Sequence, residues 1–120
     1  MLVELEQKED VCILRLKGRC VTGADTEYLR GKTDEIKSRN CGKVLADFRQ
    51  VPYIDSSGIA FVVAIYTSVT KSAGGRFVLV GPQPLVREVL DLTRLSTVIP
   101  LAEDIAAGLA ELDGPAARSV

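Results

Sequence analysis

The sequence YIDSSGIAFVV, residues 53–63, determines the fold assignment of this chain. Within it an acid, two serines and a glycine interrupt apolar sequence, and a dense run of β-branched and aromatic residues follows. Asp and Ser are preferred N-cap residues, so the tetrapeptide from Asp55 to Gly58 can be interpreted as no more than the start of a buried helix. The alternative interpretation is that one of the two serines is present for its hydroxyl group.

The segment that follows, residues 59–69, has the composition of a strand but the length and position of a helix. Its β-branched residues are poor helix formers and favour a strand by propensity alone. However, about seventeen residues separate Asp55 from the glycine turn at 74–75, too many for one strand, and two parallel strands need a crossover between them. We therefore predict a helix with one buried face, formed by Ile59, Val62, Val63, Tyr66 and Val69.

Two strands, a helix and a third strand are expected before this segment. Apolar and polar residues alternate on both sides of a polar turn at 8–10, which is typical of a hairpin whose second strand ends at Gly18. The spacing after Thr22 matches a capping box with Thr22 as N-cap, and it predicts a helix that ends at 40–42. Gly31 inside this helix indicates either fraying or close packing. The apolar stripe of the helix consists of Tyr28, Leu29 and Ile36, and residues 43–48 form the buried strand that follows it.

The C-terminal half continues the alternation of strands and helices. We predict a strand at 77–80, a helix starting at Pro84, a last strand at 97–99 stopped by Pro100, and a final helix carrying Ile105, Leu109 and Leu112. The resulting order, β-β-α-β-α-β-α-β-α, indicates an α/β domain in which a hairpin leads into parallel crossovers. We expect one domain over residues 1–120, with 113–120 as a flexible tail.

Composition and charge exclude several classes of function. A net charge of -1, few aromatics and no Trp provide neither a broad attraction to nucleic acid nor a base-stacking platform, so no direct nucleic-acid binding is expected. The longest apolar run, 59–66, is too short for membrane insertion, and the acidic N-terminus is not a signal peptide. We therefore expect a cytoplasmic protein. Its three cysteines, Cys12, Cys20 and Cys41, have no C-x-x-C spacing and are expected to be reduced thiols.

The chain lacks the residue patterns of the common enzymatic sites. It contains no histidine, which removes the Ser-His-Asp triad, Cys-His nucleophile pairs and His-based metal sites. No G-x-S-x-G elbow, P-loop or G-x-G-x-x-G motif is present either. Asp47, Asp55 and Asp91 do not have the spacing of a metal site, and we expect Asp47 to be a local hydrogen-bond acceptor. No catalytic residue, cofactor or metal is therefore assigned.

Two long stretches of the chain resemble a known family. VLADFRQVPYIDSSGIAFVV, residues 44–63, and KSAGGRFVLVGPQPLVREVLDLTRLSTVIPLAED, residues 71–104, are similar to the STAS domain of bacterial anti-sigma factor antagonists. The resemblance extends over about residues 11–112. It implies a mixed sheet of about five strands, with about four helices mostly on one side, and a protein that is a switch rather than an enzyme.

The resemblance also implies a mechanism and a site. In the family, the serine that follows the Asp is phosphorylated by a partner that is both anti-sigma factor and serine kinase. The unphosphorylated form binds this partner and releases a sigma factor, and a PP2C-type phosphatase resets the cycle. By position, the acceptor carried over is Ser56, and Asp55, Ser57 and Gly58 complete the motif. A constitutive scaffold or subunit, in a stressosome-like or lipid-transport complex, is the alternative function.

Further residues are expected to shape the partner surface. Many family members have an acidic sequence after the second strand, whereas this chain has Gly18-Arg19-Cys20-Val21, and Arg19 is expected at the same end of the fold as Ser56. Phe61 and Ile65 lie off the predicted buried face of their helix, so they are either an exposed apolar partner contact or covered by neighbouring helices.

Overall fold

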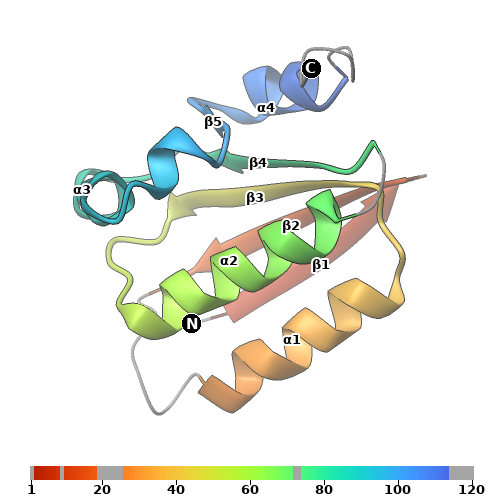
Figure 1. Ribbon diagram of the computed structural model, residues 1–120, viewed down its shortest axis with the longest axis horizontal. Coiled ribbons are helices and arrows are strands. Elements are labelled where there is room, and N and C mark those ends of the chain that lie inside the picture. Colours follow the sequence, from red (N-terminus) through yellow and green to blue (C-terminus); the bar gives the residue numbers. More distant parts are fainter. Residues whose placement is uncertain (1, 9, 19–25, 72–73, 114–120) are drawn as a thin grey trace.

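The computed structural model describes residues 2–8, 10–18, 26–71 and 74–113, which form a mixed five-stranded sheet with four α-helices (Figure 1). The strands lie side by side in chain order, with β1 and β2 antiparallel and every later pair of neighbours parallel. This confirms the predicted α/β class, the order of elements and the helical assignment of residues 59–69. The elements are β1 (Leu2–Lys8), β2 (Val11–Lys17), α1 (Thr26–Ser38), β3 (Lys43–Gln50), α2 (Ser56–Thr70), β4 (Arg76–Val80), α3 (Pro84–Leu92), a 3-10 turn η1 (Leu95–Thr97), β5 (Leu101–Ala102) and α4 (Ile105–Leu112).

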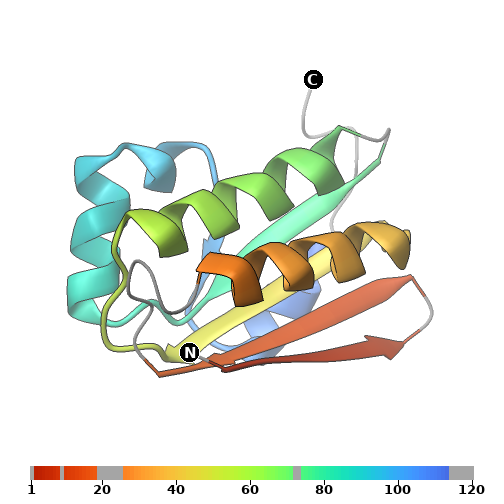
Figure 2. The same ribbon diagram turned by 90° about the horizontal axis from the view of Figure 1, so that it is seen from below.

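The central strands send alternate side chains into two separate cores. In β3, Val44, Ala46 and Phe48 belong to the larger core, which also contains the buried residues of α1, α2 and α3. Leu45, between them, belongs to the smaller core on the opposite face, together with Leu112 of α4. Figure 2 shows α1 and α2 side by side across one face of the sheet, with α4 behind it. Three of the four helices thus share one core, as the family resemblance implied.

Charged residues occupy the β1–β2 positions that point away from α1 and α2. Glu4 forms an ion pair with Lys17 (3.1 Å), and Glu6 forms one with Arg15 (2.7 Å). All four side chains are at least 41% exposed, so each pair adds little to stability. The other face of the hairpin is apolar and contacts α1, where the Val3 amide donates to the Tyr28 hydroxyl at 2.9 Å.

The prediction of a strand at residues 97–99 is wrong. Residues 95–97 form the 3-10 turn, and the amides of Val98 and Ile99 both donate to the Leu95 carbonyl (3.0 and 2.8 Å), so they are not available to a sheet. Ile99 is buried because the turn points it into the larger core. Pro100 precedes the last strand rather than ending it: its carbonyl accepts from the Leu79 amide at 3.0 Å, and β5 follows.

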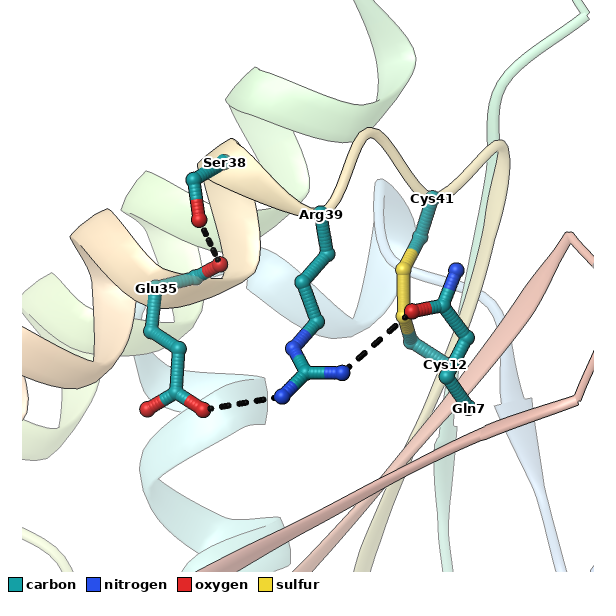
Figure 3. The surroundings of a disulfide bond; sticks show 6 residues. All are labelled: Gln7, Cys12, Glu35, Ser38, Arg39 and Cys41. Atoms are coloured by element: carbon teal, nitrogen blue, oxygen red, sulfur yellow. Dashed lines mark hydrogen bonds and ion pairs between the residues drawn. A yellow bond between two sulfur atoms is a disulfide. The ribbon is translucent and has the colours of Figure 1, made fainter.

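The expectation that the cysteines are reduced thiols is wrong for one pair. Cys12, at the start of β2, and Cys41, after α1, are joined in a disulfide (Figure 3), with their Cα atoms 5.9 Å apart. Asn40 adopts a left-handed conformation (φ 56°), which ends α1 and turns the chain back toward β2. Cys20 and Arg19, like the predicted N-cap Thr22, lie outside the described residues.

Two helix glycines generate a matched stability prediction. An added Cβ at Gly31 would meet nothing within 4 Å, so of the two alternatives given for this glycine, close packing is absent. Gly31→Ala should raise the free energy of unfolding by about 0.5–1 kcal/mol, because Gly is the weaker helix former. At Gly108 of α4 the same atom would lie 2.7 Å from Val80 Cγ2 and 2.9 Å from Leu45 Cδ1. Gly108→Ala should therefore lower stability by about 1–3 kcal/mol.

Urea denaturation of the two variants beside the parent chain measures both effects. A Gly31→Ala variant less stable than the parent would mean that this position of α1 is packed, contrary to the structure.

Candidate functional site

The tetrapeptide Asp55 to Gly58 begins α2, and Asp55 is its N-cap. The backbone of Asp55 is extended (φ -115°, ψ -160°), and its Oδ1 accepts a hydrogen bond from the Ser57 amide at 2.9 Å. Its carbonyl accepts the first helical bond, from the Ile59 amide at 3.0 Å. The capping interpretation of this sequence is therefore right for Asp55. Because the carboxylate performs the capping, the hydroxyl of Ser56 is not needed for it.

The connection from β3 holds Ser56 at the surface. Val51 and Ile54 are fully buried and anchor the segment between strand and helix, and the Val51 amide donates to the Phe48 carbonyl at 3.0 Å. The chain then emerges at the carboxyl ends of the parallel strands, where ligands and partners are commonly bound in such folds. Ser56, the first residue of α2, is exposed, whereas Ser57 is half-buried and Gly58 is buried.

A groove of about 390 Å³ runs between α1 and α2 and includes Ser56 in its wall. On the α2 side the side chains are small: Ser56, Ser57, Ala60 and Ala64. The α1 side presents Arg30, Asp34 and Lys37, which recur at helical spacing, above the apolar Leu29 and Phe61 at the base. Two cations and one anion therefore line a groove that opens beside an exposed serine at a helix N-terminus, where free N–H groups favour negative charge.

Of the two alternatives for Phe61 and Ile65, the structure shows the buried one, so they are not an exposed apolar contact. Phe61 is 5% exposed and Ile65 is 1% exposed, and both belong to the larger core. Val63, predicted to point inward, is instead 36% exposed. The buried stripe of α2 consists of Gly58, Phe61, Val62, Ile65 and Val69, with Ile59 and Tyr66 half-buried beside it. The stripe is rotated from the predicted one because α1 packs alongside α2 and covers the flank that carries Phe61.

The loop that contains Arg19 is described only at its start. Gly18 has a φ of 91°, which favours glycine, and its amide donates to the Gln50 carbonyl at 3.0 Å. This bond joins the end of β2 to the end of β3. The loop therefore leaves the sheet at the carboxyl end of β3, the end from which the chain continues to Ser56.

Asp47 is a local hydrogen-bond acceptor, as predicted. Both of its carboxylate oxygens accept from the Arg49 guanidinium at 3.0 Å, and Oδ1 also accepts from the Arg49 amide at 3.1 Å. Burial acts to raise the pKa of Asp47, but the hydrogen bonds and charge of Arg49 outweigh it, and the pKa is lowered. In the part of the chain that the structure describes, no cluster of acidic or cysteine side chains could hold a metal ion.

The family model that matches this chain is the STAS domain, over residues 3–108. The chain belongs to the STAS domain family. Because the match covers the hairpin, the Asp-Ser-Ser-Gly helix start and all five strands, it includes the whole wall of the groove beside Ser56. No helix among the described residues is long and apolar enough to cross a membrane.

Relatives across the STAS family cover nearly the whole chain. The anti-sigma F factor antagonist of Paenibacillus polymyxa is 26% identical over 112 residues, which are 92% of this chain and 94% of that protein. A crystal structure of a Thermotoga maritima protein superposes with a TM-score of 0.83 at 25% identity, covering 93% of this chain and 95% of that one. The Bacillus protein SpoIIAA in its phosphorylated form has a TM-score of 0.67 at 23% identity, covering 88% and 96%, and shows the same fold.

The burial of Phe61 in this STAS domain generates a second prediction. Phe61→Ala should lower the free energy of unfolding by about 3–5 kcal/mol, because it leaves a cavity between α2 and its neighbours. Val63→Ala, two residues along the same helix, should change stability by less than about 1 kcal/mol, because its side chain is partly in solvent. Thermal and urea unfolding of the two variants gives the comparison. Similar stabilities of the two variants would contradict the burial of Phe61 and favour the alternative of an exposed partner contact.

Proposed function

We propose that residues 1–120 act as a single STAS domain that is an anti-sigma factor antagonist gated by phosphorylation of Ser56. The observation that carries the proposal is the arrangement at the start of α2, where Asp55 caps the helix and the adjacent Ser56 is an exposed residue. In its unphosphorylated form the protein binds an anti-sigma factor with serine kinase activity and releases a sigma factor. A PP2C-type phosphatase restores this form.

The relatives support this proposal. The protein of Paenibacillus polymyxa that matches over 112 residues is an anti-sigma F factor antagonist. SpoIIAA, which shares the fold, is an anti-sigma factor antagonist whose structure is known in an unphosphorylated and a phosphorylated form. By this proposal the present chain is a cytoplasmic binding protein and not a catalyst, and the kinase and the phosphatase supply the chemistry.

Phosphorylation is expected to act at the interface rather than on the fold. A phosphate on Ser56 adds roughly -1.5 to -2 charges at neutral pH. The N-terminus of α2 favours this charge by about 0.3–1 kcal/mol, and Asp55 opposes it by a comparable amount. Arg30 lines the same groove and adds a nearby positive charge. If the partner has no matching cation, burying the phosphate dianion in the interface costs several kcal/mol. The binding free energy of the complex would be weakened by that amount.

The acceptor residue can be tested directly. Incubation with the cognate kinase and ATP should add one phosphate, on Ser56, because this residue is exposed whereas Ser57 is half-buried. Mass-spectrometric peptide mapping locates the phosphate, and Ser56→Ala and Ser57→Ala serve as a matched pair. Only Ser56→Ala should abolish transfer. Phosphate found on Ser57 alone, or full transfer to Ser56→Ala, would contradict the assignment.

The gating itself predicts opposite behaviour for two substitutions. Ser56→Asp should keep the parent fold and melting temperature but bind the anti-sigma factor at least about a hundredfold more weakly, which corresponds to ~3 kcal/mol. Ser56→Ala should bind the anti-sigma factor with the affinity of the parent, and treatment with kinase and ATP should not reduce that affinity. Isothermal titration calorimetry against the anti-sigma factor measures affinity, and circular dichroism controls for the fold. Equal affinities for the two variants would exclude the switch and favour the constitutive scaffold.

A further inference from the structure

The two sulfur atoms of the Cys12–Cys41 disulfide differ in accessibility. Cys12 lies inside the larger core and has no exposed surface. Cys41 is half-buried in the loop between α1 and β3, where the left-handed Asn40 turns the chain (Figure 3). Thiol–disulfide exchange requires a thiolate to reach one sulfur, so access selects which of the two is attacked. Here only Cys41 borders a space that a small thiol could enter.

That space is a pocket of about 200 Å³ between the C-terminal ends of α1 and α2. Cys41 lines it together with Lys37 and Asn40 on one side and Ser68 and Lys71 on the other. No carboxylate is among its described lining residues. Within the same described part of the chain, neither lysine forms an ion pair.

None of the nearby acidic residues lines this pocket, and Asp34, three residues before Lys37, lines the neighbouring groove with it instead. Glu35 is engaged by Lys32 at 3.3 Å and by Arg39 at 3.5 Å, and Arg39 also donates to Gln7 (Figure 3). Asp10 lies beside Gly42 on the hairpin side of the loop and does not line the pocket. The pocket therefore places two lysines, neither of them in an ion pair among the described residues, next to the half-buried cysteine of a disulfide.

We propose that this pocket is a thiol–disulfide exchange site for a negatively charged low-molecular-weight thiol. The thiolate attacks Cys41 Sγ, a bond forms between these two sulfurs, and the bond to Cys12 breaks. Cys12 leaves as a thiolate and takes up a proton, so the chain then carries a mixed disulfide at Cys41. A second thiolate attacks the sulfur of the bound thiol, releases Cys41 and forms the oxidised thiol dimer. The disulfide has then been reduced by two electrons, supplied by two thiols.

Lys37 and Lys71 act on this exchange by concentrating the anionic thiol and its thiolate next to Cys41. The disulfide closes a span of 29 residues that contains all of α1. Its reduction therefore releases a constraint on the helix that forms one wall of the groove beside Ser56. The proposal stands on the pocket and the disulfide, and it is independent of phosphorylation.

The test compares three thiols on the oxidised full-length chain carrying Cys20→Ser, which removes the third sulfur. Reduced glutathione is anionic, 2-mercaptoethanol is neutral and cysteamine is cationic. After brief exposure and acid quenching, mass-spectrometric mapping locates the mixed disulfide and gives its rate of formation. The adduct should be on Cys41. The double substitution Lys37→Gln/Lys71→Gln should slow glutathione most, roughly threefold to tenfold, 2-mercaptoethanol less and cysteamine least, because their attacking thiolate forms carry successively less negative charge.

Lys17→Gln, at the opposite end of β2, is the matched control and should leave all three rates unchanged. High salt should lower the rate of glutathione relative to that of 2-mercaptoethanol in the parent chain but not in the double variant. Three results would overturn the proposal: an adduct on Cys12, equal slowing of all three thiols, or no crosslinked Cys12–Cys41 peptide in the oxidised protein. Circular dichroism of each variant ensures that a change in rate is not a change in fold.

Discussion

The strand β3 is the constraint on which the rest of the molecule depends. Its residues 44–48 are buried, with apolar side chains directed alternately into the two cores, and it pairs with a parallel strand on each side. Because parallel neighbours require crossovers, helices must cover the sheet, and the segment after β3 must leave from its carboxyl end. The fully buried Val51 and Ile54 then determine where α2 starts, and hence where Ser56 lies.

Much of this could be predicted from the sequence, because strand alternation and crossover length are local properties. The helix at 59–69 could be predicted because the length and position of the segment outweigh the strand propensity of its β-branched residues. The buried face of this helix could not be predicted in the same way. Residues 58–65 of α2 are all apolar, so the sequence does not indicate which side of the helix α1 covers. Residues 97–99 have β-branched composition, yet local hydrogen bonds from their amides to the Arg94 and Leu95 carbonyls decide their backbone. The disulfide joins cysteines separated by a whole helix, and no spacing rule links them.

The site shows why four residues of sequence could not distinguish a cap from a functional serine. The capping interpretation is right for Asp55, which accepts a hydrogen bond from the amide of Ser57, and the adjacent Ser56 is an exposed residue. Only the structure separates these roles, because the preference for Asp and Ser at helix starts is the same in either case. The groove was not foreseen either, since its charged wall comes from α1, which is separated from Ser56 in sequence by the whole of β3.

The cross-strand ion pairs of the hairpin limit how a partner can approach the sheet. An extended segment adds to a sheet by pairing with an open edge strand, and charged side chains along that edge oppose such pairing. One edge here is β1, with Glu4, Glu6 and Lys8 along it, and the other is β5, which is only two residues long. Neither edge offers a good template for strand addition. For the proposed binding function, this favours recognition through the side chains of α1 and α2 that line the groove, which can be substituted without disturbing any strand.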